Sequence, residues 1–303
     1  MMKKVIIISL VLVVTLPVSS CNGEELPSAE EIIDRAIAAL ENLETYRCDA
    51  EIDIEMTLEA EGETGGLTAG ADYSGTMDIT NYEMMINMDI DMTGTGELGE
   101  DMTMTIGAEM YLVNNTLYAN IDMPFFMNGV LGSEWIKSEI PEDLMEQSIP
   151  TNQMDSLTQI LELVEFKVTG TQIVNSADCY VLEFTPDPDE LWELMMQQLQ
   201  ISEQMRDTLD TELELIHTIV DDIANNISVK LLIAKDTYFM TRIEFDISLD
   251  LTPEDLGEPE EEGRLRADIT MIFDVYEINC PVSIELPPEA SDAVEMPLGD
   301  MPW

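Results

Sequence analysis

The chain has 303 residues and is strongly acidic, with 63 Asp and Glu against 12 Lys and Arg and a formal net charge of −51. So few basic residues exclude a patch that could neutralise nucleic-acid phosphates, and we expect no nucleic-acid partner. Hydrophobic residues make up 45% of the chain, which is enough for a folded core despite the charge. A single histidine and no Cys-x-x-Cys pair argue against a zinc or redox site, so we expect no metal and no cofactor.

The N-terminus has the organisation of a secretory leader. Two lysines precede an apolar run, Val5 to Leu16, and small residues lead from it to Cys21. The run is too short to cross a bilayer of roughly 30 Å, so residues 1–20 are predicted to be a signal peptide. The end of this segment resembles the lipobox of bacterial lipoproteins. That resemblance implies a diacylglycerol anchor on Cys21, a lipidated tether over 21–27 and a position on the extracytoplasmic face of the cell membrane.

Loss of this leader leaves ten basic residues against 63 acidic ones, a formal charge of −53. In the alternative, the leader is a plain secretory signal and Cys21 is incidental. With Cys21 lipidated, Cys48, Cys179 and Cys280 remain, and any two of these three could form a disulfide outside the cytoplasm.

The folded part is expected to begin with one helix. Ser28 stands three residues before Glu31, the spacing of a capping box. Apolar residues then recur at helical spacing, and they predict a helix from about Ala29 to Glu44. They are Ile32, Ile33, Ala36, Ile37, Leu40 and Leu43.

From Cys48 onward the apolar residues alternate with polar ones, which is typical of antiparallel strands with one buried and one wet face. Clear alternation covers residues 50–58, 82–92, 102–112, 243–251 and 265–275. Weaker segments near 70–80, 116–122, 134–138, 165–174, 178–184 and 227–235 bring the total to about eleven strands.

Turn and loop signals separate these strands. Asn114-Asn115 predicts a tight hairpin, and Lys235-Asp236 predicts a second turn. The glycine-rich segment Gly62–Gly70 and the acidic segment Pro253–Gly263 are expected to be loops.

Two further helical regions interrupt the strands. One is expected from about Thr151 to Val164. In the other, Asp187 caps and Pro188 occupies the first helical position, and helical spacing continues to about Asn225 with a break near Ile201-Ser202. The proline-rich tail, residues 287–303, is expected to hold little regular structure.

Eleven strands at about 4.8 Å spacing make a sheet roughly 50 Å wide, and three or four helices of about 10 Å each could cover most of its apolar face only if the sheet curls around them. We therefore expect an α+β fold in which a large antiparallel sheet curls around its helices, with an apolar crevice between them. A sandwich of two sheets that cover each other is the alternative.

Local sequence and element order together resemble the LolA/LolB lipoprotein-carrier superfamily, and more closely its anchored LppX/LprG-like lipoproteins. The similar segments are Ala29–Ile33 with Tyr46, Ser133–Lys137, Tyr276–Asn279 and Leu286–Ala290. The resemblance implies that residues 28–286 form a half-barrel around helices that binds acyl chains or other lipophilic molecules. Only the lipobox cysteine carries over as a specific residue.

The chain contains 22 methionines, and many of them occupy inward strand positions. Methionine adapts to irregular apolar ligands, although ordinary core filling is the alternative reading. The predicted cavity lining is Met84, Met88, Ile106 and Met110 from the sheet with Trp192, Met195, Met196 and Leu199 from the helices.

Other chemistry has little support in the sequence. Asp89 and Asp91 begin a spacing like that of a calcium loop, but a strand pattern precedes it, so they are read as the wet face of a strand. There is no G-x-S-x-G elbow, and His217 lies in a predicted helix, so no enzyme activity is expected. We therefore expect a membrane-anchored lipoprotein that binds or transfers a lipid. The alternative is a structural, envelope-associated or sensory surface lipoprotein that does not transport, and the protein partner is left open.

Overall fold

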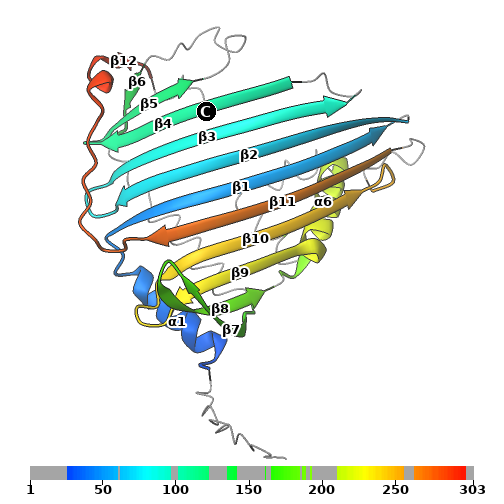
Figure 1. Cartoon of the computed structure of the whole chain (residues 1–303), viewed down its shortest axis with the longest axis horizontal. Coiled ribbons are helices and arrows are strands. Elements are labelled where there is room, and N and C mark those ends of the chain that lie inside the picture. The colour runs from blue at the N-terminus through cyan, green and yellow to red at the C-terminus, as the bar shows by residue number, and fades with distance from the viewer. Residues whose placement is uncertain are drawn as a thin grey trace, which may run out of the picture.

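One sheet of twelve strands makes up most of the described part of the protein in the computed structural model (Figure 1). The structure describes residues 26–60, 62–96, 102–122, 135–141, 161, 165–184, 186–188, 192, 210–255 and 263–297. The described strands follow the order β12-β6-β5-β4-β3-β2-β1-β11-β10-β9-β8-β7. The N- and C-terminal halves of the chain therefore meet where β1 pairs with β11.

The first half of the sheet contains β1 (Thr45–Ala60), β2 (Glu63–Asp78), β3 (Glu83–Gly96), β4 (Met102–Val113), β5 (Thr116–Asp122) and β6 (Ile136–Glu139). The second half contains β7 (Lys167–Val174), β8 (Ala177–Phe184), β9 (Ile227–Ala234), β10 (Met240–Leu251) and β11 (Gly263–Tyr276). The last strand, β12 (Val294–Glu295), returns to the first half and pairs with β6. The helices are α1 (Ala29–Leu40), α6 (Asp210–Asn226) and the 3-10 turn η1 (Pro288–Asp292).

All neighbouring strands are antiparallel except β12, which runs parallel to β6. β1 and β2 pair without interruption from Thr45↔Asp78 to Ala60↔Glu63, so the alternating pattern of β1 puts one class of side chain on each face. The described strands form a single open sheet with edges at β7 and β12. The predicted α+β class with one large open antiparallel sheet is confirmed, and the two-sheet sandwich is wrong.

The glycine-rich segment Gly62–Gly70, expected to be a loop, is instead the first half of β2. From Gly65 to Gly70 its residues pair with β1 on one side and with β3 on the other. Hydrogen bonds to two long neighbours hold this segment extended although glycine favours strands weakly. The twelfth strand, Val294–Glu295, also exceeds the eleven expected because two residues give no periodic signal.

α1 begins and packs as predicted. The Ser28 side chain accepts a hydrogen bond from the backbone N–H of Glu31 at 3.1 Å, the first half of a capping box. Ile32 and Ala36 on its buried face join a cluster with Leu231 and Ile233 of β9. The helix ends at Leu40, four residues before the expected end.

The later helical regions are only partly described. Leu161 is helical and buried, and the rest of the predicted helix 151–160 and 162–164 lies outside the described residues. Pro188, Trp192 and α6 are helical, and α6 ends at Asn226, next to the expected Asn225. The expected break near Ile201 lies outside the described residues. α6 packs against β10, at the opposite end of the strands from α1 (Figure 1).

The predicted tight hairpin at Asn114-Asn115 is confirmed. Both residues have positive φ, 52° and 60°, and they connect the Val113↔Thr116 pair of β4 and β5. Positive φ at both central positions is the backbone of a type I′ turn, which Asn tolerates well. The second expected turn, at Lys235-Asp236, lies between β9 and β10.

Asn279, just after β11, holds the connection between α1 and β1. Its side-chain oxygen accepts hydrogen bonds from the backbone N–H groups of Glu44 (2.8 Å) and Thr45 (3.4 Å), and its amide donates to the Asn42 carbonyl (2.9 Å). The α1–β1 connection is thereby held against the end of β11.

The described residues 287–297 of the tail, which was expected to hold little regular structure, contain the 3-10 turn η1 and the strand β12, and the C-terminal segment packs on the sheet. Ile284, Ala290 and Ala293 form a buried cluster with Tyr111 and Trp135. The backbone N–H of Val294 donates to the Trp135 carbonyl at 2.8 Å. This segment therefore covers one edge of the sheet.

The three cysteines whose pairing the sequence left open are all free. Cys48 and Cys179 are buried in different parts of the sheet, and Cys280 is exposed.

Candidate functional site

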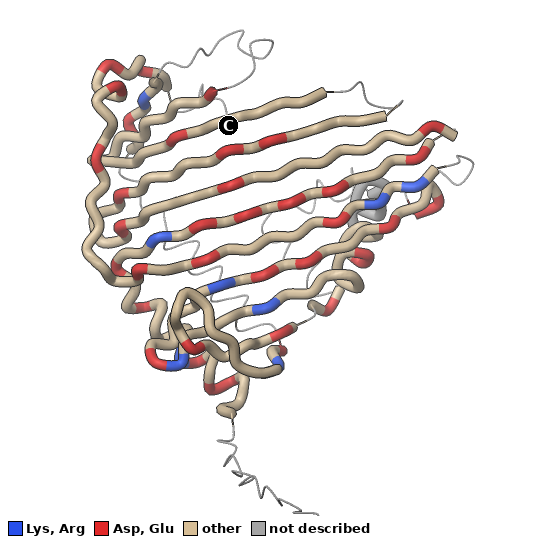
Figure 2. The backbone as a smooth tube through the Cα atoms, viewed as in Figure 1, with Lys and Arg blue, Asp and Glu red and all other residues tan. Residues whose placement is uncertain are grey.

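The sheet has one uncharged face and one acidic face. We call the face that carries α1 the inner face, and the opposite one the outer face. On β1 the inner residues are Cys48, Ala50, Ile52, Ile54, Met56 and Leu58, and in the register they lie across from apolar or small residues of β2 and β11. The outer residues of the same strand are Asp49, Glu51, Asp53, Glu55, Thr57 and Glu59. Figure 2 shows the resulting rows of acidic residues along the middle strands.

The inner face is tightly packed at two corners. At one, Leu182, Leu231 and Ile233 lie buried under α1. At the other, Leu112, Leu117, Ala119 and Ile136 form a buried cluster on β4, β5 and β6. Both clusters have the burial expected of an ordinary core.

Between these corners, although Met104 of β4 is 7% exposed, most of the large apolar side chains of the described strands are only half-buried. They are Ile52, Ile54, Met56, Ile86, Met88, Ile90, Met92, Ile106, Phe245, Ile247, Ile269, Met271 and Phe273. An apolar area of this width normally marks an interaction site or a ligand groove, because soluble proteins seldom leave it exposed. The middle of the inner face is therefore the candidate site.

The sheet residues predicted to line the cavity come together there. Met84, Met88, Ile106 and Met110 all lie on the inner face, in the paired strands β3 and β4. Met84 and Met110 pack against the corner cluster at Leu112 and are half-buried. Met88 and Ile106 lie in the open middle, which makes them the better candidates for a lining role.

The helical part of the prediction is only partly visible. Trp192 is half-buried, and its ring centroid lies 4.8 Å from that of His217 in α6. His217 also lies 3.2 Å from Asp221 one turn later, in keeping with a structural role. Met195, Met196, Leu199 and the anchor residue Cys21 lie outside the described residues.

The inner face also carries a polar cluster that sequence reasoning missed, formed by Tyr46, Cys48 and Tyr73. The Tyr73 hydroxyl and the Cys48 thiol are hydrogen-bonded to each other, and both lie over Gly75. A Cβ atom at Gly75 would lie 2.9 Å from the Cys48 sulfur and 3.1 Å from the Tyr73 oxygen, so only glycine leaves room for this arrangement.

Burial determines the protonation of this cluster. It raises the pKa of the Cys48 thiol to about 11 and that of Tyr46 to about 12, and it raises the pKa of Tyr73 further. All three groups are therefore neutral hydrogen-bonding groups near pH 7. The sequence signal was available, because Tyr46, Cys48 and Tyr73 share the inward parity of their strands, but the contact itself depends on the β1–β2 register.

A hollow of about 530 Å³ lies beside α1 and borders the packed corner of the inner face. Apolar side chains, among them Ile33, Ile37 and Phe166, form part of its wall. Glu30, Asp34 and Glu165 contribute carboxylates to the same wall. A ligand that approached the inner face from this side would pass negative charge.

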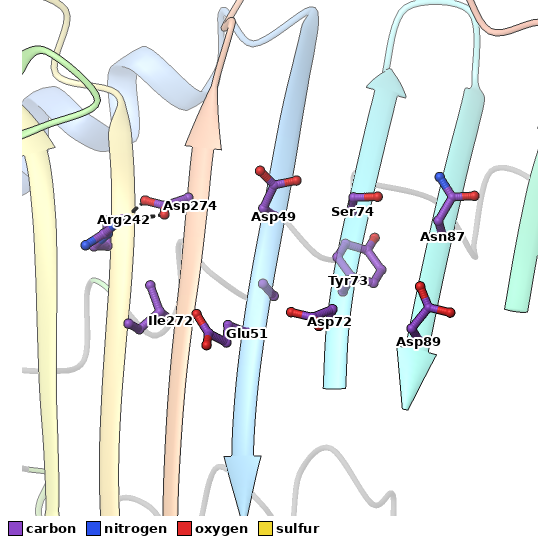
Figure 3. A pocket seen from close by; sticks show the side chains of 11 residues that line it. Asp49, Glu51, Asp72, Tyr73, Ser74, Asn87, Asp89, Arg242, Ile272 and Asp274 are labelled. Atoms are coloured by element: carbon purple, nitrogen blue, oxygen red, sulfur yellow. Dashed lines mark hydrogen bonds and ion pairs between the residues drawn. The ribbon is translucent and has the colours of Figure 1, made fainter. Parts of the chain in front are cut away.

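The outer face holds two shallow hollows of about 410 and 710 Å³ above β11, β1, β2 and β3. The first is lined by Asp49, Glu51, Asp72, Asp89 and Asp274 with a single cation, Arg242 (Figure 3). Arg242 donates two hydrogen bonds to Asp274, at 2.8 and 2.7 Å, and this pairing raises the pKa of Arg242. Carboxylates directly opposite one another in a sheet repel, so Arg242 offsets part of that cost.

No group of three His, Cys, Asp or Glu residues in the described part of the chain is arranged to hold a metal ion. Asp89 and Asp91 lie on the outer face of β3, as expected for the wet side of a strand. No described helix is long and apolar enough to cross a membrane.

Comparison with known proteins assigns the chain to a family. Residues 28–295 match the model of a family of unknown function, DUF6612, and the chain belongs to that family. None of the curated proteins matches the chain significantly.

Among solved structures, the chain is similar to the lipoprotein LppX of Mycobacterium tuberculosis, with 13% identity over 85% of this chain and 98% of that one and a TM-score of 0.35. It is also similar to LprF from Mycobacterium bovis, with 11% identity over 86% and 96% and a TM-score of 0.38. A LolA superfamily protein from Nitrosomonas europaea shares 12% identity over 86% and 96%, with a TM-score of 0.21.

Proposed function

We propose that this protein is a membrane-anchored, extracytoplasmic lipoprotein that binds or transfers a lipid or other lipophilic molecule against the inner face of its sheet. The observation that carries the proposal is the half-buried middle of that face, where Met88, Ile90 and Ile106 lie between two fully packed corners.

Burial varies within the inner face of the sheet. Leu112 and Leu231 are almost completely buried, whereas Ile90 and Met271 on the same face are half-buried. Apolar area left in water gives up roughly 25 cal/mol for each Å², so a ligand that covers this area gains that free energy on binding. Methionine side chains suit the role because they adapt to acyl chains of different shape.

Native mass spectrometry of the mature protein, purified from membranes, tests the proposal. We expect a bound lipid that is released and identified after solvent extraction. Ala71→Phe fills the middle of the inner face, across from Ile52 and Ile90, and is expected to reduce bound lipid several-fold. Thr68→Phe, an exposed position on the outer face of the same strand, is the matched control and should keep the lipid. Wild-type protein without lipid, and without affinity for an added acyl probe, would contradict the proposal.

The anchor has its own test. Cys21→Ala removes the thiol that the lipobox resemblance assigns to the diacylglycerol. Incorporation of labelled palmitate should disappear in this variant, and the protein should leave the membrane fraction. Palmitate labelling that persists in Cys21→Ala would place the modification elsewhere.

The outer face favours a second candidate, a surface lipoprotein that presents this face to a protein partner without transporting lipid. Its support is the pair of hollows lined by Asp49, Glu51, Asp53 and Glu55. On this reading Ala71→Phe leaves the cellular phenotype of the wild type unchanged, whereas Glu51→Gln with Asp53→Asn alters it. The opposite outcome supports the lipid carrier.

A further inference from the structure

The inner face is almost free of charge. At the inner positions of the described strands β1, β2, β3, β4, β10 and β11 there is no Lys or Arg, and the only carboxylate is Glu63 at the hairpin end of β2. The outer positions of the same strands carry the acidic rows described above. A ligand on the inner face therefore meets uncharged groups over the whole width of these six strands.

Most basic residues of the described part of the chain are paired with carboxylates. Seven are in ion pairs: Arg35, Arg47, Lys230, Lys235, Arg242, Arg264 and Arg266. The other two, Lys137 of β6 and Lys167 of β7, occupy outer positions of the sheet, across from Tyr118 and Glu183. Past residue 25, the parts of the sequence outside the described residues contain one basic residue, Arg206. The inner positions of the described strands named above thus supply no cation to pair with a phosphate or carboxylate on a ligand.

An anionic headgroup would therefore be buried without a partner, which is costly for any charged group removed from water. It would also approach through negative potential, because Glu30, Asp34 and Glu165 line the hollow beside α1 and the mature chain carries a formal charge of −53. A neutral polar group needs only hydrogen-bond partners.

Such partners exist next to the open middle of the face. Tyr73 lies directly across from Met88, and Cys48 lies across from Gly75 one pair further along the sheet. Tyr46 is the next inner residue of β1 before Cys48, so the three polar groups adjoin the predicted lining. A hydroxyl group can donate to an ester carbonyl or accept from an alcohol, and burial keeps these phenols in that protonated form.

We infer that the hydroxyl groups of Tyr46 and Tyr73 form the binding site for the uncharged polar end of the ligand, a hydroxyl or ester group, with the buried Cys48 thiol as the hydrogen-bond partner of Tyr73, and that the protein discriminates against lipids with anionic headgroups. This rests on the proposed function, because it assigns the headgroup chemistry of the same lipid. Acyl or isoprenoid chains would lie over Met88 and Ile106, and the polar end would reach Tyr73.

The test compares two probes with the same chains, dioleoylglycerol and dioleoylphosphatidic acid, for binding to the delipidated mature protein. We expect at least tenfold tighter binding of dioleoylglycerol, in 0.05 M and in 1 M NaCl alike. The phosphate would lack a protein cation at the binding site itself, and salt does not screen an effect at so short a range. Equal or tighter binding of the phosphatidic acid overturns the inference, as does a preference that vanishes in 1 M NaCl.

A variant pair tests the role of the cluster. Tyr73→Phe removes the hydroxyl and keeps the ring, and it should weaken dioleoylglycerol binding about tenfold while hexadecane, which has no polar group, binds as before. Tyr118→Phe on β5 is the control and should change neither. Unchanged dioleoylglycerol binding in Tyr73→Phe overturns the assignment of the site. Failure of wild-type protein to bind hexadecane and dioleoylglycerol at all would instead refute the proposed function itself.

Discussion

Arg242 is the residue whose loss should most clearly reveal the electrostatic balance of the outer face. It lies in β10 and pairs with Asp274 of β11, which in turn lies directly across from Asp49 of β1. Arg242→Gln keeps a long polar side chain but removes the only cation of the hollow that Figure 3 shows. Asp274 would then face Asp49 without a cation, and would keep only the hydrogen bond that the Asn175 side-chain amide donates to it at 3.5 Å.

The expected magnitude follows from burial. The side chains of Arg242 and Asp274 are 23% and 20% exposed, whereas those of the Arg266–Glu59 pair are 48% and 47% exposed. Breaking a fully buried pair costs about 3–5 kcal/mol and an exposed pair about 0–1 kcal/mol. We therefore expect Arg242→Gln to lower the free energy of unfolding by about 2 kcal/mol. Arg266→Gln, the matched control, should lower it by less than about 1 kcal/mol.

Urea denaturation followed by circular dichroism measures both variants. Adding Asp274→Asn to Arg242→Gln should restore about half of the loss, because it removes the repulsion that the first change exposes. If Arg242→Gln and Arg266→Gln differ by less than about 0.5 kcal/mol, or if Asp274→Asn deepens the loss, the assignment of Arg242 as the stabilising cation is refuted.

Three further predictions concern the inner face and helix α1. Ile233→Ala in the packed corner should lower the free energy of unfolding, measured by urea denaturation, by about 3 kcal/mol. Ile90→Ala in the open middle should lower it by less than half of that, since a half-buried side chain leaves a smaller cavity. Equal losses would mean that the middle is as tightly packed as the corner. Ser28→Ala removes the cap of α1 and should lower the free energy of unfolding by about 1 kcal/mol. An unchanged free energy of unfolding would show that the Glu31 backbone N–H needs no side-chain acceptor. Because burial raises the pKa of Cys48 from its ordinary value of 9.0 to about 11, its neutral thiol stabilises the fold fully below pH 9, and that contribution is lost as the pH rises through 11. A thiol reagent at pH 8 should accordingly label Cys280 and leave Cys48 unlabelled, and rapid labelling of both would contradict the burial of Cys48.

Part of the site could be read from the strand pattern. Met84, Met88, Ile106 and Met110 share a parity in their strands, so their common face followed once β3 and β4 were recognised as neighbours across the loop between them. Which of them lie in the open middle did not follow. Burial depends on what packs above a residue, and Met84, unlike Met88, packs against the cluster at Leu112, its partner in β4.

The glycine-rich start of β2 could not be predicted from the strand preference of its own residues. Gly65, Gly66 and Gly70 have weak strand preference by themselves, and only pairing with β1 and β3 on both sides makes them a strand. The Tyr46–Cys48–Tyr73 cluster was missed for a related reason, since it needs the register of that same strand.

The sequence by itself determined the properties that depend on residues close together in the chain. These are the capped start of α1, the Asn114-Asn115 hairpin, and the separation of charged from apolar side chains along each strand. The tertiary structure decided the pairing of β1 with β11, the attachment of the C-terminal segment beside β6, and the contrast between packed corners and an open middle. The first two of these features join residues more than 150 positions apart, and periodicity within a strand carries no information about which distant strand or helix will cover it.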